Sequence, residues 1–321
     1  MKSRQHAQEE PAPEAGWAVS VSRAASEDVR ELLRADQRRR RGRWFAGGLV
    51  VLAVGAVVTL LIRSSLFAPV TGDPVATVPA PVRSTAQFDL ANPFDSTPAA
   101  DWANGVAGIT TPPAEAVGGF SAVQVAEATG LARDALAASR IDPRLLTEHD
   151  PAGYLGLLAP DARRQLEPLF AEGNEPDVQS LVSMVAPGSE LLPAEPKVSG
   201  SMSVRTGDPD ELVVHTNYVF AYAFRPNGPM KLMDAMTVIV VVRADVDYVL
   251  RSGDRWTQDS RGLWFGAASG FGYSIGCDAY RKGFLAPVAA EPSVTARSGD
   301  REPGAFFDPS APLPAAGGCR G

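Results

Sequence analysis

The chain has few of the residues and motifs on which most hydrolases and metalloenzymes rely. Its 321 residues include three histidines, two cysteines and only 7% aromatic residues. The sequence has no H-E-x-x-H zinc motif, no Walker phosphate loop, no S-x-x-K motif and no G-x-G-x-x-G. These absences argue against the metalloprotease, nucleotide-binding, penicillin-binding and dinucleotide-binding classes. We therefore expect no catalytic residue, no metal ligand and no cofactor.

One stretch does match a hydrolase pattern, because Gly272-Tyr273-Ser274-Ile275-Gly276 fits the G-x-S-x-G nucleophile elbow. A serine nucleophile needs a histidine base, and in α/β hydrolases that histidine follows the serine along the chain. No histidine follows Ser274. An order with His149 or His215 before the serine stays open, although nothing around either residue supports it. We interpret the stretch as a glycine-rich strand end.

The sequence contains one long uncharged run, Trp44–Ile62, with nineteen residues and a single hydroxyl group. A helix of that length spans close to the roughly 30 Å hydrocarbon core of a bilayer. A buried helix of a soluble protein would usually have a polar face. A cleaved signal peptide would have a shorter apolar run and a small-residue cleavage site, and the next residues, 63–70, contain no A-x-A. We therefore predict an uncleaved transmembrane helix over residues 44–63.

The charges on the two sides of this run predict its orientation. Residues 1–43 contain ten basic and seven acidic residues, and four adjacent arginines, Arg38–Arg41, lie close to the run. Residues 44–321 contain twenty basic and thirty acidic residues. Basic clusters hold their end of a span in the cytoplasm, so we expect the C-terminal part to be extracytoplasmic. Its acidity argues against nucleic acid as a partner, and the arginines indicate contact with the lipid bilayer.

The two cysteines, Cys277 and Cys319, both fall in the predicted extracytoplasmic part. An isolated pair in an oxidising compartment is a plausible disulfide, although two independent thiols remain the alternative. The sequence has no C-x-x-C, so it suggests neither a zinc ribbon nor a thioredoxin-like redox pair. We predict that this disulfide pins a Pro/Gly-rich tail.

Composition and periodicity divide the rest of the chain. Helical spacing follows Ser121, a candidate N-cap, and Asp142-Pro143 and Pro160-Asp161 open further short helices. Residues 177–184 predict a fourth helical turn. We expect a cytoplasmic segment, the span, an extended Pro/Ala-rich linker, an α+β domain and the tail, over residues 1–43, 44–63, 64–119, 120–285 and 286–321 respectively.

After Pro196 the apolar period changes from about 3.6 to two, which indicates strands. Long strands are predicted at residues 212–224 and 236–250, with shorter ones at 198–205 and 263–267. Helices followed by antiparallel strands predict an α+β domain with helices packed on one face of a curved sheet.

Four residues of the strand region are candidates for lining a pocket: His215, Trp256, Trp264 and Tyr273. Aromatic side chains can line a cavity, although they more often belong to a core or a sheet face. A lone histidine on a strand is more often structural than a ligand or a base. We read Asp245 and Asp247 as solvated alternate residues near the end of a strand.

The element order resembles the NTF2-like (cystatin-like) α+β cone. The similarity covers residues 121–285: LLTEHDPAGYLGLLAPDARRQL looks like the helical half, and ELVVHTNYVFAYAFR looks like a long strand. The layout with one predicted span is similar to actinobacterial single-pass membrane proteins, and 26 arginines against four lysines suit a GC-rich genome. The resemblance implies a fold and a place in the cell envelope, and it carries no site residue.

Three functions stay open on the sequence. The first is a non-enzymatic, membrane-anchored binding or assembly module that contacts an envelope protein or another copy of itself. The second is an NTF2-like domain that binds a small ligand or catalyses modest hydrolysis, using the aromatic side chains of the strand region with His215 or Ser274. The third is a transmembrane signalling protein that acts through its first 43 residues.

Overall fold

A computed structural model describes residues 89–227, 235–290, 303–313 and 319. The predicted cytoplasmic segment, the predicted span at 44–63 and the first part of the predicted linker lie outside these residues. Among the residues that are described, no helix has the length and apolar character needed to cross a membrane.

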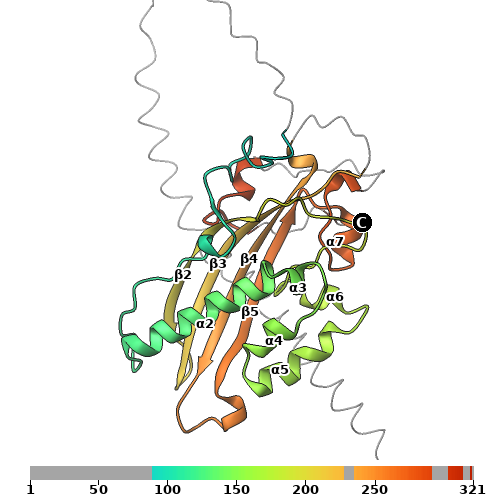
Figure 1. Cartoon of the computed structure of the whole chain (residues 1–321). Coiled ribbons are helices and arrows are strands. Elements are labelled where there is room, and N and C mark those ends of the chain that lie inside the picture. The colour runs from blue at the N-terminus through green and yellow to red at the C-terminus, as the bar shows by residue number, and fades with distance from the viewer. Residues whose placement is uncertain (1–88, 228–234, 291–302, 314–318, 320–321) are drawn as a thin grey trace, which may run out of the picture.

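The domain is built on a five-stranded antiparallel sheet in which each strand pairs with the next one along the chain (Figure 1). The strands are β1 Ala103–Asn104, β2 Lys197–Thr206, β3 Glu211–Ala223, β4 Ile239–Arg251 and β5 Gly262–Tyr273. The predicted α+β class and antiparallel strands are therefore confirmed.

The last strand, β5, extends well past the 263–267 predicted from the sequence. A register shift opposite Val246 and Tyr248 interrupts the pairing with β4, after which the strand continues to Tyr273. Gly270 permits this continuation, because a Cβ there would lie 2.1 Å from the carbonyl oxygen of Arg243. Glycine lowers the strand signal in a sequence, although here it allows two backbones to approach closely.

Helices cover one face of the sheet, which we call the inner face (Figure 1). The helices are α2 Ala122–Arg140, α3 Pro143–Leu146, α4 Ala152–Gly156, α5 Pro160–Leu166, α6 Glu175–Val178 and α7 Cys277–Arg281. Ser121 and Gln124 form a reciprocal capping box at the start of α2, and the Asp142 side chain accepts from the backbone N–H of Arg144 at α3. Both predicted caps are confirmed.

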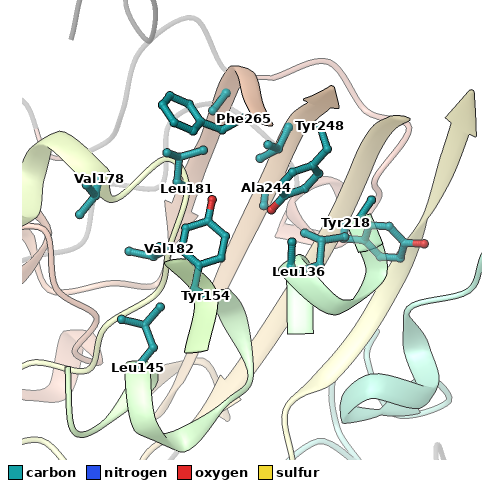
Figure 2. Close-up of a cluster of buried hydrophobic side chains, with 14 of the residues drawn as sticks. Leu136, Leu145, Tyr154, Val178, Leu181, Val182, Tyr218, Ala244, Tyr248 and Phe265 are labelled. Carbon is teal, nitrogen blue, oxygen red and sulfur yellow. The ribbon is translucent and has the colours of Figure 1, made fainter. Parts of the chain in front are cut away.

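The inner face is the main hydrophobic core. Alternate residues of β3, including Tyr218, Phe220 and Tyr222, are fully buried against the helices. Tyr154 from α4 and Tyr248 from β4 project toward one another across this core (Figure 2). The period-two pattern of β3 therefore places its aromatic side chains on the face that the helices cover.

A fully buried arginine, Arg140, lies at the end of α2. Its guanidinium donates to the carbonyl oxygens of Ser180 and Val182, the latter at 2.8 Å, and to Ser183 Oγ at 3.2 Å. These acceptors belong to the segment after α6, where the sequence predicted a helix over 177–184. That helix ends at Val178, and the carbonyl groups that follow accept from Arg140.

Two segments outside the helical layer, residues 89–102 and residues 303–313, cover one end of the opposite face of the sheet. We call this face the outer face. Phe94 and Ala99 are buried there with Phe307 from the tail, and the rings of Trp102 and Phe307 are 5.8 Å apart. Residues 89–119 were expected to belong to an extended linker. Their proline-rich composition excludes long helices and strands, but it does not prevent individual side chains from packing.

The disulfide Cys277–Cys319 is present, with 5.1 Å between the two Cα atoms. It joins the first residue of α7 to the end of the tail, 42 positions later in the sequence. Between them, residues 303–313 lie on the sheet, where Phe306 stacks on Tyr273 with 3.9 Å between ring centroids. The predicted disulfide therefore closes a loop whose middle part packs on the outer face.

Replacing both cysteines by serine, Cys277→Ser with Cys319→Ser, should lower the free energy of unfolding by about 3–4 kcal/mol, because the unfolded chain regains the entropy of that loop. Urea denaturation of the oxidised wild type and the variant measures the difference. An unchanged unfolding midpoint and slope would contradict this expectation.

Tyr222→Phe should destabilise the domain by about 1–2 kcal/mol. Burial raises the pKa of Tyr222 to about 12, so its hydroxyl stays neutral, and it lies 2.9 Å from the carbonyl oxygen of Arg140 and 3.1 Å from Ser183 Oγ. The matched control is Tyr218→Phe, which removes a 2.8 Å bond to the carbonyl oxygen of exposed Thr110, where water can substitute. Equal losses in the two variants would contradict the assigned role of Tyr222.

Candidate interaction surface

Beyond the end covered by the two segments, the outer face of the sheet carries charged and polar side chains. They occupy alternate positions of the strands, so they project to the same side. We call this set the outer-face network, and it consists of Arg205, Glu211, His215, Asn217, Arg243, Asp245, Asp247 and Arg251.

The centre of the network is Asp247 on β4. Its two carboxylate oxygens accept from neighbours on different strands, with His215 Nδ1 at 2.8 Å and Arg205 Nη2 at 2.9 Å. A second carboxylate, that of Asp245, lies 3.8 Å from the same His215 nitrogen. Strands β2, β3 and β4 are therefore linked through side chains as well as through the backbone.

Burial and hydrogen bonding act in opposite directions on the carboxyl group of Asp247. Partial burial raises its pKa, but the hydrogen bond from His215, together with the charges of His215 and Arg205, outweighs burial and lowers the pKa below the ordinary value of 3.8. An ionised carboxylate can only accept, so His215 Nδ1 donates in this pair.

Towards the tail, the network reaches the segment that covers the sheet. Arg243 Nε donates to Asn217 Oδ1 at 2.9 Å, and its Nη1 donates to the carbonyl oxygen of Ala311. Asn217 Nδ2 donates to the carbonyl oxygen of Pro309 at 2.8 Å. The network therefore also holds the tail in place.

Towards the other end of the sheet, the network joins an aromatic cluster. The Arg251 guanidinium carbon lies 4.3 Å from the ring centroid of Trp256 and 3.9 Å from that of Trp264, and Arg251 Nε donates to Glu211 at 2.9 Å. Stacking fixes the planar guanidinium between two large rings, an arrangement that lysine cannot reproduce.

The structure places the four predicted pocket residues on the outer face. His215 and Trp264 project from it, Trp256 stacks on Arg251, and Tyr273 stacks under Phe306 of the tail. Asp245 and Asp247, which were expected to be solvated, belong to this surface and are largely buried, with Asp245 5% exposed and the Asp247 side chain 17% exposed. The period-two spacing of Arg243, Asp245 and Asp247 is a signal from which their shared face could have been predicted.

Ser274 lies in the turn that follows β5, with a positive φ of 55°. Its hydroxyl donates to the carbonyl oxygen of Met236. No histidine among the described residues hydrogen-bonds to it: His149 Nε2 contacts the carbonyl oxygen of Val185, and His215 contacts Asp247. The G-x-S-x-G match therefore corresponds to a tight turn that is hydrogen-bonded to the segment just before β4.

A cavity of about 270 Å³ lies elsewhere, at the edge of the sheet formed by β5. Its walls come from Arg140 and from residues 176–183, 242–243, 268–272 and 280–285. None of the four predicted pocket residues lines it. In the described part of the chain, no group of three or more histidine, cysteine, aspartate or glutamate side chains is arranged to hold a metal ion.

Comparison with known proteins found no matching family model, no matching curated protein and no matching solved structure.

Asp247→Asn should lower the stability of the domain at neutral pH by about 1 kcal/mol, because a charge-assisted bond becomes a neutral one. The folded-state pKa of Asp247 is lowered, so its contribution is complete above about pH 4 and is lost as the pH falls further. The wild type should therefore lose more stability than the variant between pH 4 and pH 2.

The free energy of unfolding in urea, measured across that pH range, tests this prediction. The control is Asp134→Asn, which removes an exposed carboxylate of α2 that lies 3.8 Å from Arg133. Parallel stability curves for wild type and Asp247→Asn would contradict the assigned role.

Proposed function

We propose that this chain is a membrane-anchored, extracytoplasmic binding or assembly module of the bacterial cell envelope, and that it is not an enzyme. The observation that carries the proposal is the outer-face network with its stacked Trp–Arg–Trp cluster. Interfaces are enriched in tryptophan and arginine, and their strongest contributors are packed aromatic and arginine side chains. The partner is another envelope protein or a second copy of the chain.

The order already present in this surface favours binding. Arg251 is held by two rings and a carboxylate, and Asp247 is held from two strands. Side chains that are fixed before association lose less conformational entropy when a partner arrives. The surface also combines both signs of charge, which suits a protein partner with complementary charges better than a uniformly anionic polymer.

Two further observations support the envelope location. A disulfide that links the domain to its tail persists in an oxidising compartment. The uncharged run of residues 44–62 beside four arginines supplies an anchor with the domain on the outside. We further propose that the sheet and its helices form an NTF2-like cone, an assignment that the helix-then-strand order supports.

A second candidate function, the binding of a small ligand, is favoured by the cavity at the β5 edge. That cavity has both apolar and polar walls, as ligand sites generally do. It does not compete with the first proposal, because Arg243 is the only residue of the outer-face network among those that line the cavity.

In-cell photo-crosslinking tests the assembly proposal. A photoreactive residue in place of Ser203, which is exposed on β2 beside His215, should yield one discrete crosslinked species. The same residue in place of Val123, which is 77% exposed on α2, should yield none. The Ser203 product should be lost when Arg205→Glu and Trp256→Ala are introduced together.

Equal crosslinking from both positions, or a product that survives the double substitution, would overturn the outer face as the binding surface. Fractionation of the same cells checks the location, since the chain should remain with the membrane and its domain should be accessible to protease from outside. A domain protected from external protease would contradict the proposed orientation.

A further inference from the structure

The cavity at the β5 edge exists because the inner-face positions of that strand carry almost no side chain. The three positions beside the cavity are Ala268, Gly270 and Gly272, and each pairs with a β4 residue whose side chain belongs to the inner core. Directly paired residues share a face of the sheet, so these three positions also face the helical layer. One methyl group and two glycines leave the space between β5 and that layer unfilled.

The backbone of the same stretch directs hydrogen-bonding groups away from the sheet. The carbonyl oxygen of Leu263 points outward from β5, since it accepts from the backbone N–H of Ala159 at 2.8 Å. In an antiparallel edge strand, the outward direction recurs at every second residue. The register shift against β4 adds one residue to β5, so the outward positions continue at Ala268, Gly270 and Gly272.

Two of these three residues are accessible. Gly270 is exposed and Gly272 is half-buried, whereas Ala268 is 1% exposed. Within the described residues, neither glycine makes a backbone hydrogen bond outside the sheet. Each glycine therefore presents one N–H and one C=O group at the edge, which is the pattern that an added strand bonds.

The strand also lacks the features that usually protect an edge from pairing. Natural sheets end in short strands, or in strands that contain charged residues or proline. The β5 strand has twelve residues, Gly262–Tyr273, and contains neither a charged residue nor a proline. An edge of this kind is suited to pairing with a further strand.

The other walls of the cavity indicate what can pair there. Residues 176–183 and 280–285 form its walls on the side of the helical layer. A second folded copy that paired antiparallel through its own β5 would be related by a two-fold axis, so its helical layer would lie on the same side of the joint sheet. That layer would meet these two segments. A single extended segment has no such layer, and its inner-facing side chain would enter the cavity.

The charges of the walls favour an apolar side chain at that point. The guanidinium groups of Arg140 and Arg243 already donate to carbonyl oxygens, in the segment after α6 and in the tail respectively. Asp177 also has a partner within the chain. A charged group entering the cavity would lose its hydration without gaining a dedicated partner. Tyr280 and Phe284 offer apolar surface instead.

We propose that the β5 edge and its cavity bind an extended, uncharged segment of a partner protein. The segment adds a strand to the sheet, its backbone bonds to Gly270 and Gly272, and one large apolar side chain enters the cavity of about 270 Å³. The proposal rests on the second candidate function, whose ligand it names. It does not depend on assembly through the outer-face network.

The test measures amide hydrogen exchange by NMR on the full chain in detergent micelles. The probe is the capped peptide acetyl-Thr-Val-Thr-Leu-Thr-Val-Thr-amide, whose valines and leucine share one face of a strand. Without peptide, the amides of Gly270 and Gly272 should exchange rapidly, because their N–H groups point away from the sheet. Saturating peptide should slow both at least about tenfold. Phe271, whose N–H points into the sheet, should exchange slowly throughout.

Two matched peptides separate backbone pairing from filling of the cavity. Methylation of the leucine nitrogen removes an N–H that would bond to the edge, and replacement of the leucine by aspartate places a charge in the cavity. Each change should weaken the Kd at least about tenfold. The variant with Arg205→Glu and Trp256→Ala should bind the first peptide with an unchanged Kd, so a failure of outer-face assembly is distinguished from a failure of this site.

Absence of saturable protection, or equal Kd values for the three peptides, would overturn the proposal. Slow exchange of Gly270 and Gly272 before any peptide is added would overturn it as well. Such protection at every protein concentration would show that another part of this chain covers the edge, and protection that grows with protein concentration would identify a second copy as the occupant.

Discussion

The arrangement of this domain depends on the buried guanidinium of Arg140. Arg140 is the last residue of α2, the longest helix of the described residues; its guanidinium donates to the carbonyl groups of the segment after α6 and lies beneath the tyrosines of the sheet. The carbonyl oxygen of the same residue lies 2.9 Å from the Tyr222 hydroxyl, so one residue connects helix, loop and strand. Because an arginine cannot lose its proton at accessible pH, the surroundings must satisfy a permanent charge. That requirement fixes the loop, and the fixed loop forms one wall of the cavity.

The two faces of the sheet obey different constraints. The inner face is covered by a large set of buried apolar side chains, and substitution there acts on stability. The outer face is held by directional contacts, such as those of Asp247 and Arg251, which define the positions of charges and rings at the surface. A surface of that kind can be altered one residue at a time without unfolding the domain, which makes it suited to specificity.

The sequence predicted those features that depend on local chemistry. Period-two alternation located β3, Ser121 as a candidate N-cap located the start of α2, and the two cysteines form the expected bond. It could not predict features that depend on distant segments. The packing of Phe94, the partners of Asp247 and the cavity at β5 each require residues far apart in the chain, and no local pattern reports such contacts. Residues 1–88 lie outside the described structure, so the span and the orientation assigned to them remain predictions.

The disulfide between α7 and the end of the tail has a mechanical consequence. Tension applied to the two ends of the chain would bypass the 42 positions between Cys277 and Cys319, because the covalent link carries the load. Fully extended, that stretch would measure about 140–150 Å, which is length that the chain cannot release while the bond is intact. Residues 89–102 have no such bridge within the described chain, so under load they would peel from the sheet before the tail did.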